Sequence, residues 1–239
     1  MSDMSLLASS QSSQRFETTH RKGTLTTTVV VRQLTGSRCC TRVDGTFSIQ
    51  IDSSDDTVNA IVEIGALESY LVSRTALAAD GSAPAWLQEV LHTGYTHAVG
   101  QFTAADLFTK TGDCALTFKE LYDDPGNPQP KFAAFAEELS ADKVLYIQEI
   151  ELDEDYRGEH LGQFALQCFH QAIVILPNGY AFSGTIVLCP CPTDPHSHES
   201  VDVYDQEVDL IGFYERLGYR LWKHEVGVCA SPIMGRRLP

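Results

Sequence analysis

An arginine-glycine turn between a strand and a helix is the first feature of the sequence that could do chemistry. Residues 144–152 (VLYIQEIEL) predict a strand, and residues 156–162 (YRGEHLG) predict a turn into a helix, because apolar residues then recur at helical spacing. Unsatisfied backbone N–H groups and the positive end of the helix dipole point to one place there, and Arg157 adds a fixed charge. The residues that would supply these amides are Gly158, Glu159, His160, Leu161, Gly162 and Gln163. This pattern predicts a site for an anionic ligand such as a pyrophosphate.

The two glycines of this turn also have a purely structural explanation. Gly158 and Gly162 would permit a tight turn and close packing of the helix on a sheet, with no ligand involved. The ligand-binding interpretation is favoured by a second motif, Phe213–Tyr219 (FYERLGY), which lies at the end of a predicted helix over residues 209–217.

The two motifs, in this order and at this separation, resemble the GNAT superfamily of N-acetyltransferases over about residues 143–226. In that family an Arg/Gln-x-x-Gly-x-Gly/Ala signature holds the pyrophosphate of acyl-CoA. Here Arg157 and Gly162 keep the register, and His160 replaces the central glycine. The family often has an asparagine seven residues before the motif tyrosine, and this chain has Glu207 there.

The resemblance implies a cofactor site and a reaction. The strand ending at Leu152 would splay from its neighbour, and the backbone near Ile150 and Leu152 would pair with the pantetheine amides of acetyl-CoA. Tyr214 would lie near the thioester sulfur and protonate the leaving thiolate. Its alternative role is that of a core aromatic with a satisfied hydroxyl group. The implied reaction is direct transfer of an acetyl group to a primary amine in a ternary complex.

Two carboxylates are the candidates for a general base. A protonated amine must lose a proton before it attacks the acyl carbon, and a carboxylate can accept that proton directly or through water. Glu149 and Glu151 are two residues apart on the predicted strand, so they share one face. If that face lines the cleft, one is the base and the other holds the ammonium; if it faces solvent, neither takes part.

The remaining pattern predicts an α/β protein with a sheet of mixed direction, and the resemblance implies that this is a GNAT-like mixed, splayed central sheet flanked by helices. A helical insertion would precede the cofactor-binding strand. Residues 57–74 fit either one bent strand or a strand with a helical continuation. The other predicted strands are 24–34, 46–51, 185–188 and a final one at 219–222, and short helices are expected between 84 and 139.

The expected domain organisation is simple. Residues 1–22 are rich in Ser, Gln and Thr and predict a disordered or loosely attached segment. Residues 23–239 would form a single GNAT-like domain whose cofactor-binding core is 143–226.

Charge and hydropathy exclude several classes of partner. The formal charge of -15 argues against nucleic acid and anionic membranes as partners. No segment approaches the ~20 apolar residues of a membrane span, and the N-terminus has no apolar signal region, so a cytoplasmic location is expected. The seven cysteines have no disulfide pattern and are expected to be reduced.

The acidic residues have two interpretations. No Lys or Arg occurs between Arg157 and Arg216. This stretch is either a solubilising surface or the approach for a cationic acceptor, such as a polyamine, an amino sugar or a Lys-bearing peptide.

Two other classes of function stay open at this point. The chain could be a GNAT-like protein that binds CoA without catalysis, or a metal-binding interaction protein. The residues suited to zinc are Cys189, Cys191, His196 and His198. The sequence does not fix the oligomeric state, for which a homodimer is one alternative.

Overall fold

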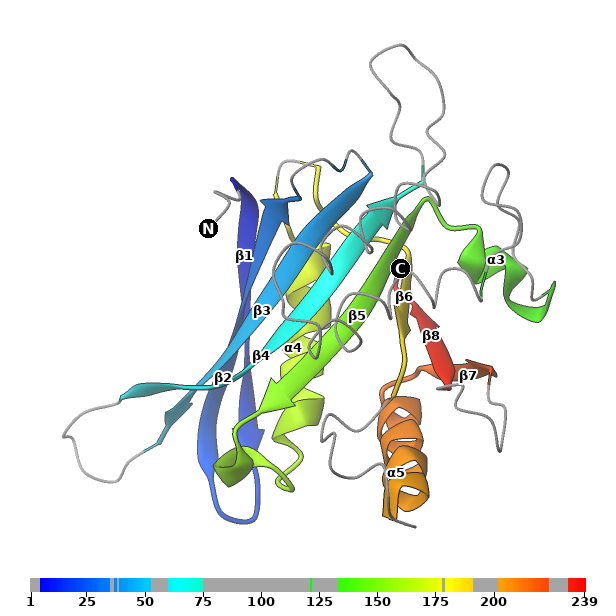
Figure 1. The fold of residues 1–239 in the computed structure, drawn as a ribbon. Helices are drawn as coiled ribbons and strands as arrows, with labels where there is room; N and C mark the ends of the chain where they lie inside the picture. The colour runs from blue at the N-terminus through cyan, green and yellow to red at the C-terminus, as the bar shows by residue number, and fades with distance from the viewer. Residues whose placement is uncertain are drawn as a thin grey trace, which may run out of the picture. The chain divides into compact units, whose positions relative to one another are not determined.

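The computed structural model describes residues 5–34, 37, 39–52, 60–74, 121, 133–177, 179–190, 202–223 and 232–239. Within this part of the chain, eight strands form a mostly antiparallel sheet in the order β1-β2-β3-β4-β5-β6-β8-β7 (Figure 1). The strands are β1 (Leu6–Glu17), β2 (Lys22–Gln33), β3 (Cys40–Ile51), β4 (Ile61–Ser73), β5 (Lys143–Leu152), β6 (Thr185–Leu188), β7 (Arg220–Lys223) and β8 (Ile233–Arg237). The helices are α3 (Ala136–Leu139), α4 (Leu161–Val174) and α5 (Asp202–Arg216), with 3-10 turns at Ala133–Phe135 and Glu154–Tyr156.

The chain divides into two compact units. The first contains Met1–Leu71 and Glu149–Ser183, and the second contains Val72–Gln148 and Gly184–Pro239. Strand β5 therefore contributes its first residues to the second unit and its last residues to the first. The expectation of one domain over residues 23–239 stays a prediction.

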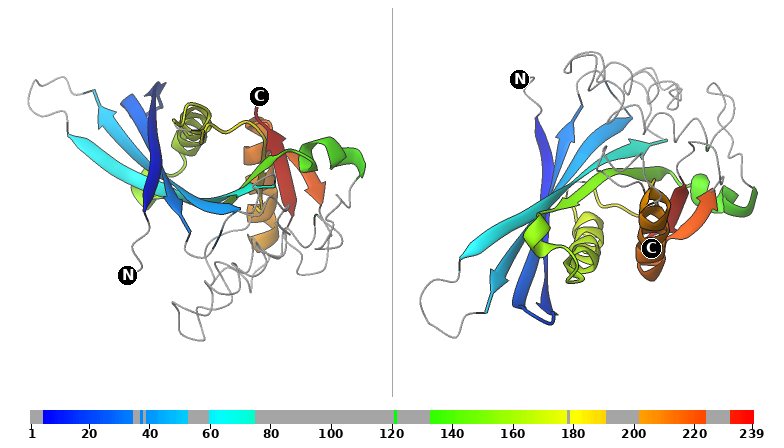
Figure 2. Two further views of the ribbon diagram at one scale, coloured as in Figure 1. Left: turned by 90° about the horizontal axis from the view of Figure 1, so that it is seen from above. Right: turned by 60° about the horizontal axis from the view of Figure 1, so that its bottom comes forward.

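In the first unit, α4 packs on β1 and β2 (Figure 2). Alternate β2 residues such as Leu25 and Val29 are fully buried, as the period of a strand with one covered face requires. The helix supplies an apolar stripe that includes Phe169 and Cys168, both completely buried. Burial raises the pKa of the Cys168 thiol to about 11, so this side chain is a neutral core group.

The expectation that residues 1–22 are disordered or loosely attached is wrong for residues 6–17, which form strand β1. This strand pairs with β2 along its length, from Leu6 opposite Arg32 to Glu17 opposite Lys22. The Ser10 hydroxyl donates to the carbonyl of Ala172 at 2.7 Å. Composition indicated disorder because the side chains are small and polar. The backbone pairing is independent of that composition, however, and Ser10 can reach the end of α4.

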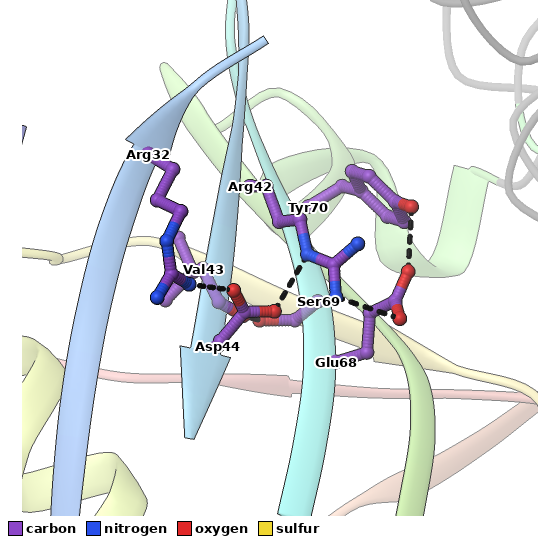
Figure 3. Close-up of polar contacts among 7 residues, drawn as sticks. All are labelled: Arg32, Arg42, Val43, Asp44, Glu68, Ser69 and Tyr70. Atoms are coloured by element: carbon purple, nitrogen blue, oxygen red, sulfur yellow. Dashed lines mark hydrogen bonds and ion pairs between the residues drawn. The ribbon is translucent and has the colours of Figure 1, made fainter. Parts of the chain in front are cut away.

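Strands β2, β3 and β4 are tied together by a charged cluster (Figure 3). The Asp44 carboxylate pairs with Arg32 and accepts from Nε of Arg42 at 2.7 Å, and Arg42 also donates to Glu68 at 3.1 Å. The Tyr70 hydroxyl donates to Glu68 at 2.7 Å. Desolvation opposes the charge of Arg42, yet its hydrogen bond to Asp44 and the nearby Glu68 raise its pKa overall. These pairs favour one register of the three strands.

The structure settles the open choice for residues 57–74 and lengthens two predicted elements. Strand β4 is one continuous strand over Ile61–Ser73, without a helical continuation. Strand β3 begins at Cys40, earlier than predicted, and α5 begins at Asp202. Most of the range 84–139, where short helices were predicted, lies outside the described residues. The 3-10 turn Ala133–Phe135 and α3 form the described end of that range.

In the second unit, β8 corrects the prediction that residues 219–222 form the final strand. It pairs with both β6 and β7 and so separates them in the sheet. The Trp222 indole covers Gly235 of β8, where a Cβ atom would overlap the ring. It also stacks on Phe135, with ring centroids 5.3 Å apart. The short β8 segment lacked a clear alternation of apolar and polar residues, which hid it from sequence patterning.

Strand β5 extends beyond the end of its parallel neighbour, β6. Its pairing with β6 runs from Val144 opposite Thr185 to Ile147 opposite Leu188, and β5 continues to Leu152. On its other side, the N–H of Asp153 donates to the carbonyl of Ile64 at 2.9 Å. The predicted α/β fold with a sheet of mixed direction is thus confirmed.

Among the described helices, none is long and apolar enough to cross a lipid bilayer.

The end of β5 lies so close to β4 that position 65 of β4 has room only for glycine. A Cβ atom at Gly65 would overlap the carbonyl oxygen of Glu151. We therefore expect Gly65→Ala to lower the free energy of unfolding by about 2 kcal/mol, the scale of an overpacked site. Denaturant titration measures this. The control is Gly212→Ala on α5, where the nearest atom to the new Cβ is a side-chain nitrogen of Arg216 at 3.7 Å. That variant should be neutral or slightly stabilising, and equal losses in both variants would contradict the explanation.

Candidate functional site

The turn between β5 and α4 has a defined backbone path. Strand β5 ends at Leu152, a 3-10 turn covers Glu154–Tyr156, and Arg157 is extended. Gly158 then has φ 78° and His160 has φ 61°, so the chain enters the left-handed region twice before α4 begins at Leu161. This path brings the chain from the end of the strand into the first turn of the helix.

The backbone N–H groups at the start of α4 are open, meaning that they donate no hydrogen bond within the described part of the chain. No backbone N–H from Gly158 to Gly162 donates to an acceptor in the part of the chain that the structure describes. His160 is the N-cap residue and makes no side-chain capping bond. Gln163 differs from the sequence-based expectation, because its N–H already donates to the carbonyl of His160 at 3.0 Å. The donors available to an anion are therefore those before Gln163.

His160 has a backbone conformation that is more usual for glycine. Its left-handed φ of 61° is uncommon for a residue with a Cβ atom, although His tolerates it better than branched residues do. The turn therefore has, at position 160, the left-handed conformation that glycine adopts most readily.

Arg157 lies over the end of β5. Its Nε donates to the carbonyl of Leu152 at 2.7 Å, and Nη2 is 3.8 Å from a carboxylate oxygen of Glu151. The side chain is 53% exposed. These contacts hold the guanidinium beside the start of the turn and leave donors facing solvent. They also occupy one lone pair of the Leu152 carbonyl.

The two candidate bases have different surroundings. Glu151 is exposed and faces Arg157, whereas Glu149 is half-buried. Ile150 and Leu152 are also half-buried, beyond the point where β5 and β6 stop pairing. No strand among the described residues pairs with this stretch on the edge that β6 occupies earlier. The structure thus brings Arg157, Glu151 and the β5 backbone together.

Tyr214 lies in the second unit, on the last turn of α5. It is 6% exposed, and its ring packs edge-on against Phe213 and Tyr219. Its carbonyl accepts the N–H groups of Leu217 and Tyr219, at 3.0 and 3.1 Å, and Gly218 has φ 82°. The FYERLGY motif therefore ends the helix, in addition to any catalytic role.

Tyr219 is a neutral core residue. Complete burial, with a smaller effect from Tyr214, raises the pKa of its phenol well above the ordinary value. The phenol therefore stays protonated in the folded protein at any pH near neutral.

The other sequence candidates are only partly described. Glu207 is half-buried on α5, and Cys189 follows β6. Cys191, His196 and His198 lie outside the described residues. No group of His, Cys, Asp and Glu within the described ranges is arranged to hold a metal ion. The metal-binding alternative stays a prediction.

The structure adds residues that sequence reasoning missed. The loop between β1 and β2 carries Thr18 and Arg21, and both reach the turn before α4. The Thr18 hydroxyl donates to Oε2 of Glu159 at 2.8 Å, and Arg21 lies 3.4 Å from Oε1. The contact spans 141 positions of sequence. No local pattern could have found it, although the basic residues of this loop were visible.

Comparison with known proteins gives no family assignment. No family model matches the chain, and no curated protein matches it.

The left-handed position of His160 leads to a stability prediction. His160→Gly should raise the free energy of unfolding by ~0.5–1 kcal/mol, because glycine removes the left-handed penalty but gains freedom in the unfolded chain. His160→Val should lower it by about 1–2 kcal/mol, because a branched residue is strained there. Urea unfolding of both variants provides the measurement. The opposite order of stabilities would refute the assigned backbone conformation.

Proposed function

We propose that this chain is a GNAT-type N-acetyltransferase that transfers the acetyl group of acetyl-CoA to a primary amine. One observation carries the proposal: β5 continues past its pairing with β6 and leads directly into a turn with open amides and Arg157. Backbone groups for an extended, amide-bearing chain and donors for an anion therefore follow each other along one segment. The two motifs supply the resemblance to the family.

Each part of acetyl-CoA has a proposed partner in this segment. The pyrophosphate would lie on the amides of Gly158 to Gly162, where the dipole of α4 adds positive potential. Arg157 would approach it from the end of β5. The pantetheine amides would pair with the backbone of Ile150 and Leu152 in the manner of an added strand. Hydrogen bonding along β5 would fix the direction of the arm and the position of the thioester.

The chemistry then requires one base and one acid. The neutral amine nitrogen attacks the acetyl carbon and the carbon–sulfur bond breaks. The nitrogen gives up one proton to become the amide, and the leaving thiolate takes one. Glu149 is the better candidate for the base, because Glu151 is exposed and ion-paired with Arg157. Tyr214 is the candidate acid for the leaving thiolate. The base acts before the attack and the acid during departure, so the two roles are separable in kinetics.

The acceptor proposed is a cationic amine. The acidic character of the chain between Arg157 and Arg216 would attract it, and the attraction would weaken with salt.

A CoA-binding protein without catalysis is the second candidate. It is favoured by the packing of Tyr214, which is almost completely buried and contributes to the end of α5. Glu207, at the position where the family often has asparagine, agrees with it.

Calorimetry with acetyl-CoA tests the proposed binding site. The native chain should bind, and Arg157→Ala should raise the Kd about tenfold, because one charge-assisted contact to a phosphate is lost. Arg237→Ala is the matched control, since Arg237 is equally exposed at 50% and also pairs with a glutamate, Glu137. Its Kd should equal that of the native chain. Absence of binding by the native chain would refute the proposal.

Steady-state kinetics with Tyr214→Phe separates the two candidate functions. If Tyr214 is the acid, kcat should fall about 100-fold while the Kd for acetyl-CoA stays within twofold of native. Turnover across a panel of neutral and polycationic amines provides the assay. Unchanged kcat would remove Tyr214 from the mechanism. Acetyl-CoA binding with no turnover of any amine would favour the non-catalytic alternative.

A further inference from the structure

The loop between β1 and β2 is bound to the turn before α4 through one arginine. Arg21 donates to the carbonyl of Asp155 at 2.9 Å, lies over the Tyr156 ring at 4.6 Å from its centroid, and pairs with Glu159 at 3.4 Å. Thr18 completes the contact by donating to the same carboxylate at 2.8 Å. A single side chain thus contacts three residues of the turn.

Glu159 is the residue that makes this contact functionally relevant. Its carboxylate belongs to the turn itself, one residue before the N-cap His160, and its side chain is only 16% exposed. An unpaired carboxylate here would interact favourably with the positive end of the helix dipole, and it would compete with an anionic ligand for the same amides. Both of its oxygens instead have partners on the β1–β2 loop.

We propose that Arg21 is a positioning residue that draws the Glu159 carboxylate toward the β1–β2 loop and neutralises it, which leaves the amides of Gly158 to Gly162 open to an anion. This rests on the proposed function, because the anion is the pyrophosphate of acetyl-CoA. Arg21 acts through Glu159 and the turn, and does not itself contact the ligand.

The residue type fits this role. A planar guanidinium can donate to a carbonyl, pair with a carboxylate and stack on an aromatic ring at the same time. A lysine would keep the charge but lose the planar group that stacks on the ring and the fixed fork of donors. The partial burial of both partners, with Arg21 26% exposed, protects the pair from screening.

A double-mutant cycle on acetyl-CoA binding tests the proposal. Arg21→Ala should raise the Kd about tenfold, because it leaves a negative charge beside the phosphates. Glu159→Gln alone keeps the backbone amide and should lower the Kd, because the charge of Arg21 is then no longer neutralised beside the phosphates. The double variant Arg21→Ala/Glu159→Gln should recover a Kd within about threefold of native, because the repelling charge is gone. In Arg21→Ala, the KM for acetyl-CoA should be raised while kcat stays within twofold of native.

Two further variants serve as controls. Arg15→Ala removes another arginine of the β1–β2 hairpin, one that pairs with Asp52 at 3.0 Å and does not reach the turn. It should leave the Kd unchanged. Arg21→Lys should fall between the native chain and Arg21→Ala, and unfolding curves establish that each variant is folded.

The outcomes distinguish this inference from the function on which it rests. Absence of acetyl-CoA binding by the native chain overturns both. Native binding with an Arg21→Ala variant that binds equally well overturns the inference alone. The inference is also overturned if the double variant binds as weakly as Arg21→Ala, because Arg21 would then only brace the turn.

Discussion

The candidate site depends on the point where β5 loses its parallel neighbour. Pairing between the two strands ends at Ile147 and Leu188, but β5 continues to Leu152. This last part of β5 is held by β4, because the N–H of Asp153 donates to the carbonyl of Ile64 and the Glu151 carbonyl packs against Gly65. One edge of the strand is therefore held while the other has no paired strand among the described residues. Backbone hydrogen-bonding groups kept in register in this way suit an extended ligand.

The electrostatics of the turn reconcile an acidic chain with the proposed anionic ligand. The formal charge is -15, yet the turn offers backbone amides, a helix N-terminus and Arg157 to an anion. Two acidic side chains of this segment are each paired with an arginine, Glu151 with Arg157 and Glu159 with Arg21. In the proposed site, this local pairing offsets part of the repulsion that the net charge would give an anion.

The sequence predicted those parts of the structure that depend on local patterns. The β-branched residues of β2, the alternation in β3 and the apolar stripe of α4 were sufficient. In β3 and α4, one covered face imposes a period on the side chains. β1 was missed because its stability lies in backbone pairing with β2 and in contacts of small polar groups such as Ser10 with α4. β8 was missed because its residues, IMGRR, do not alternate between apolar and polar. In the site, Arg157 and the open amides followed from the motif. Arg21 did not, since its partners are distant in sequence and only the fold brings them together.

The central claim is that the amides between β5 and α4 hold the pyrophosphate of acetyl-CoA. Its most direct test is a titration of ¹⁵N-labelled protein with acetyl-CoA, followed by the shifts of the backbone amide resonances. The account predicts the largest shifts at Gly158, Leu161 and Gly162, with smaller ones at Ile150 and Leu152. Binding that leaves these resonances in place while others move, or no binding at all, would contradict it.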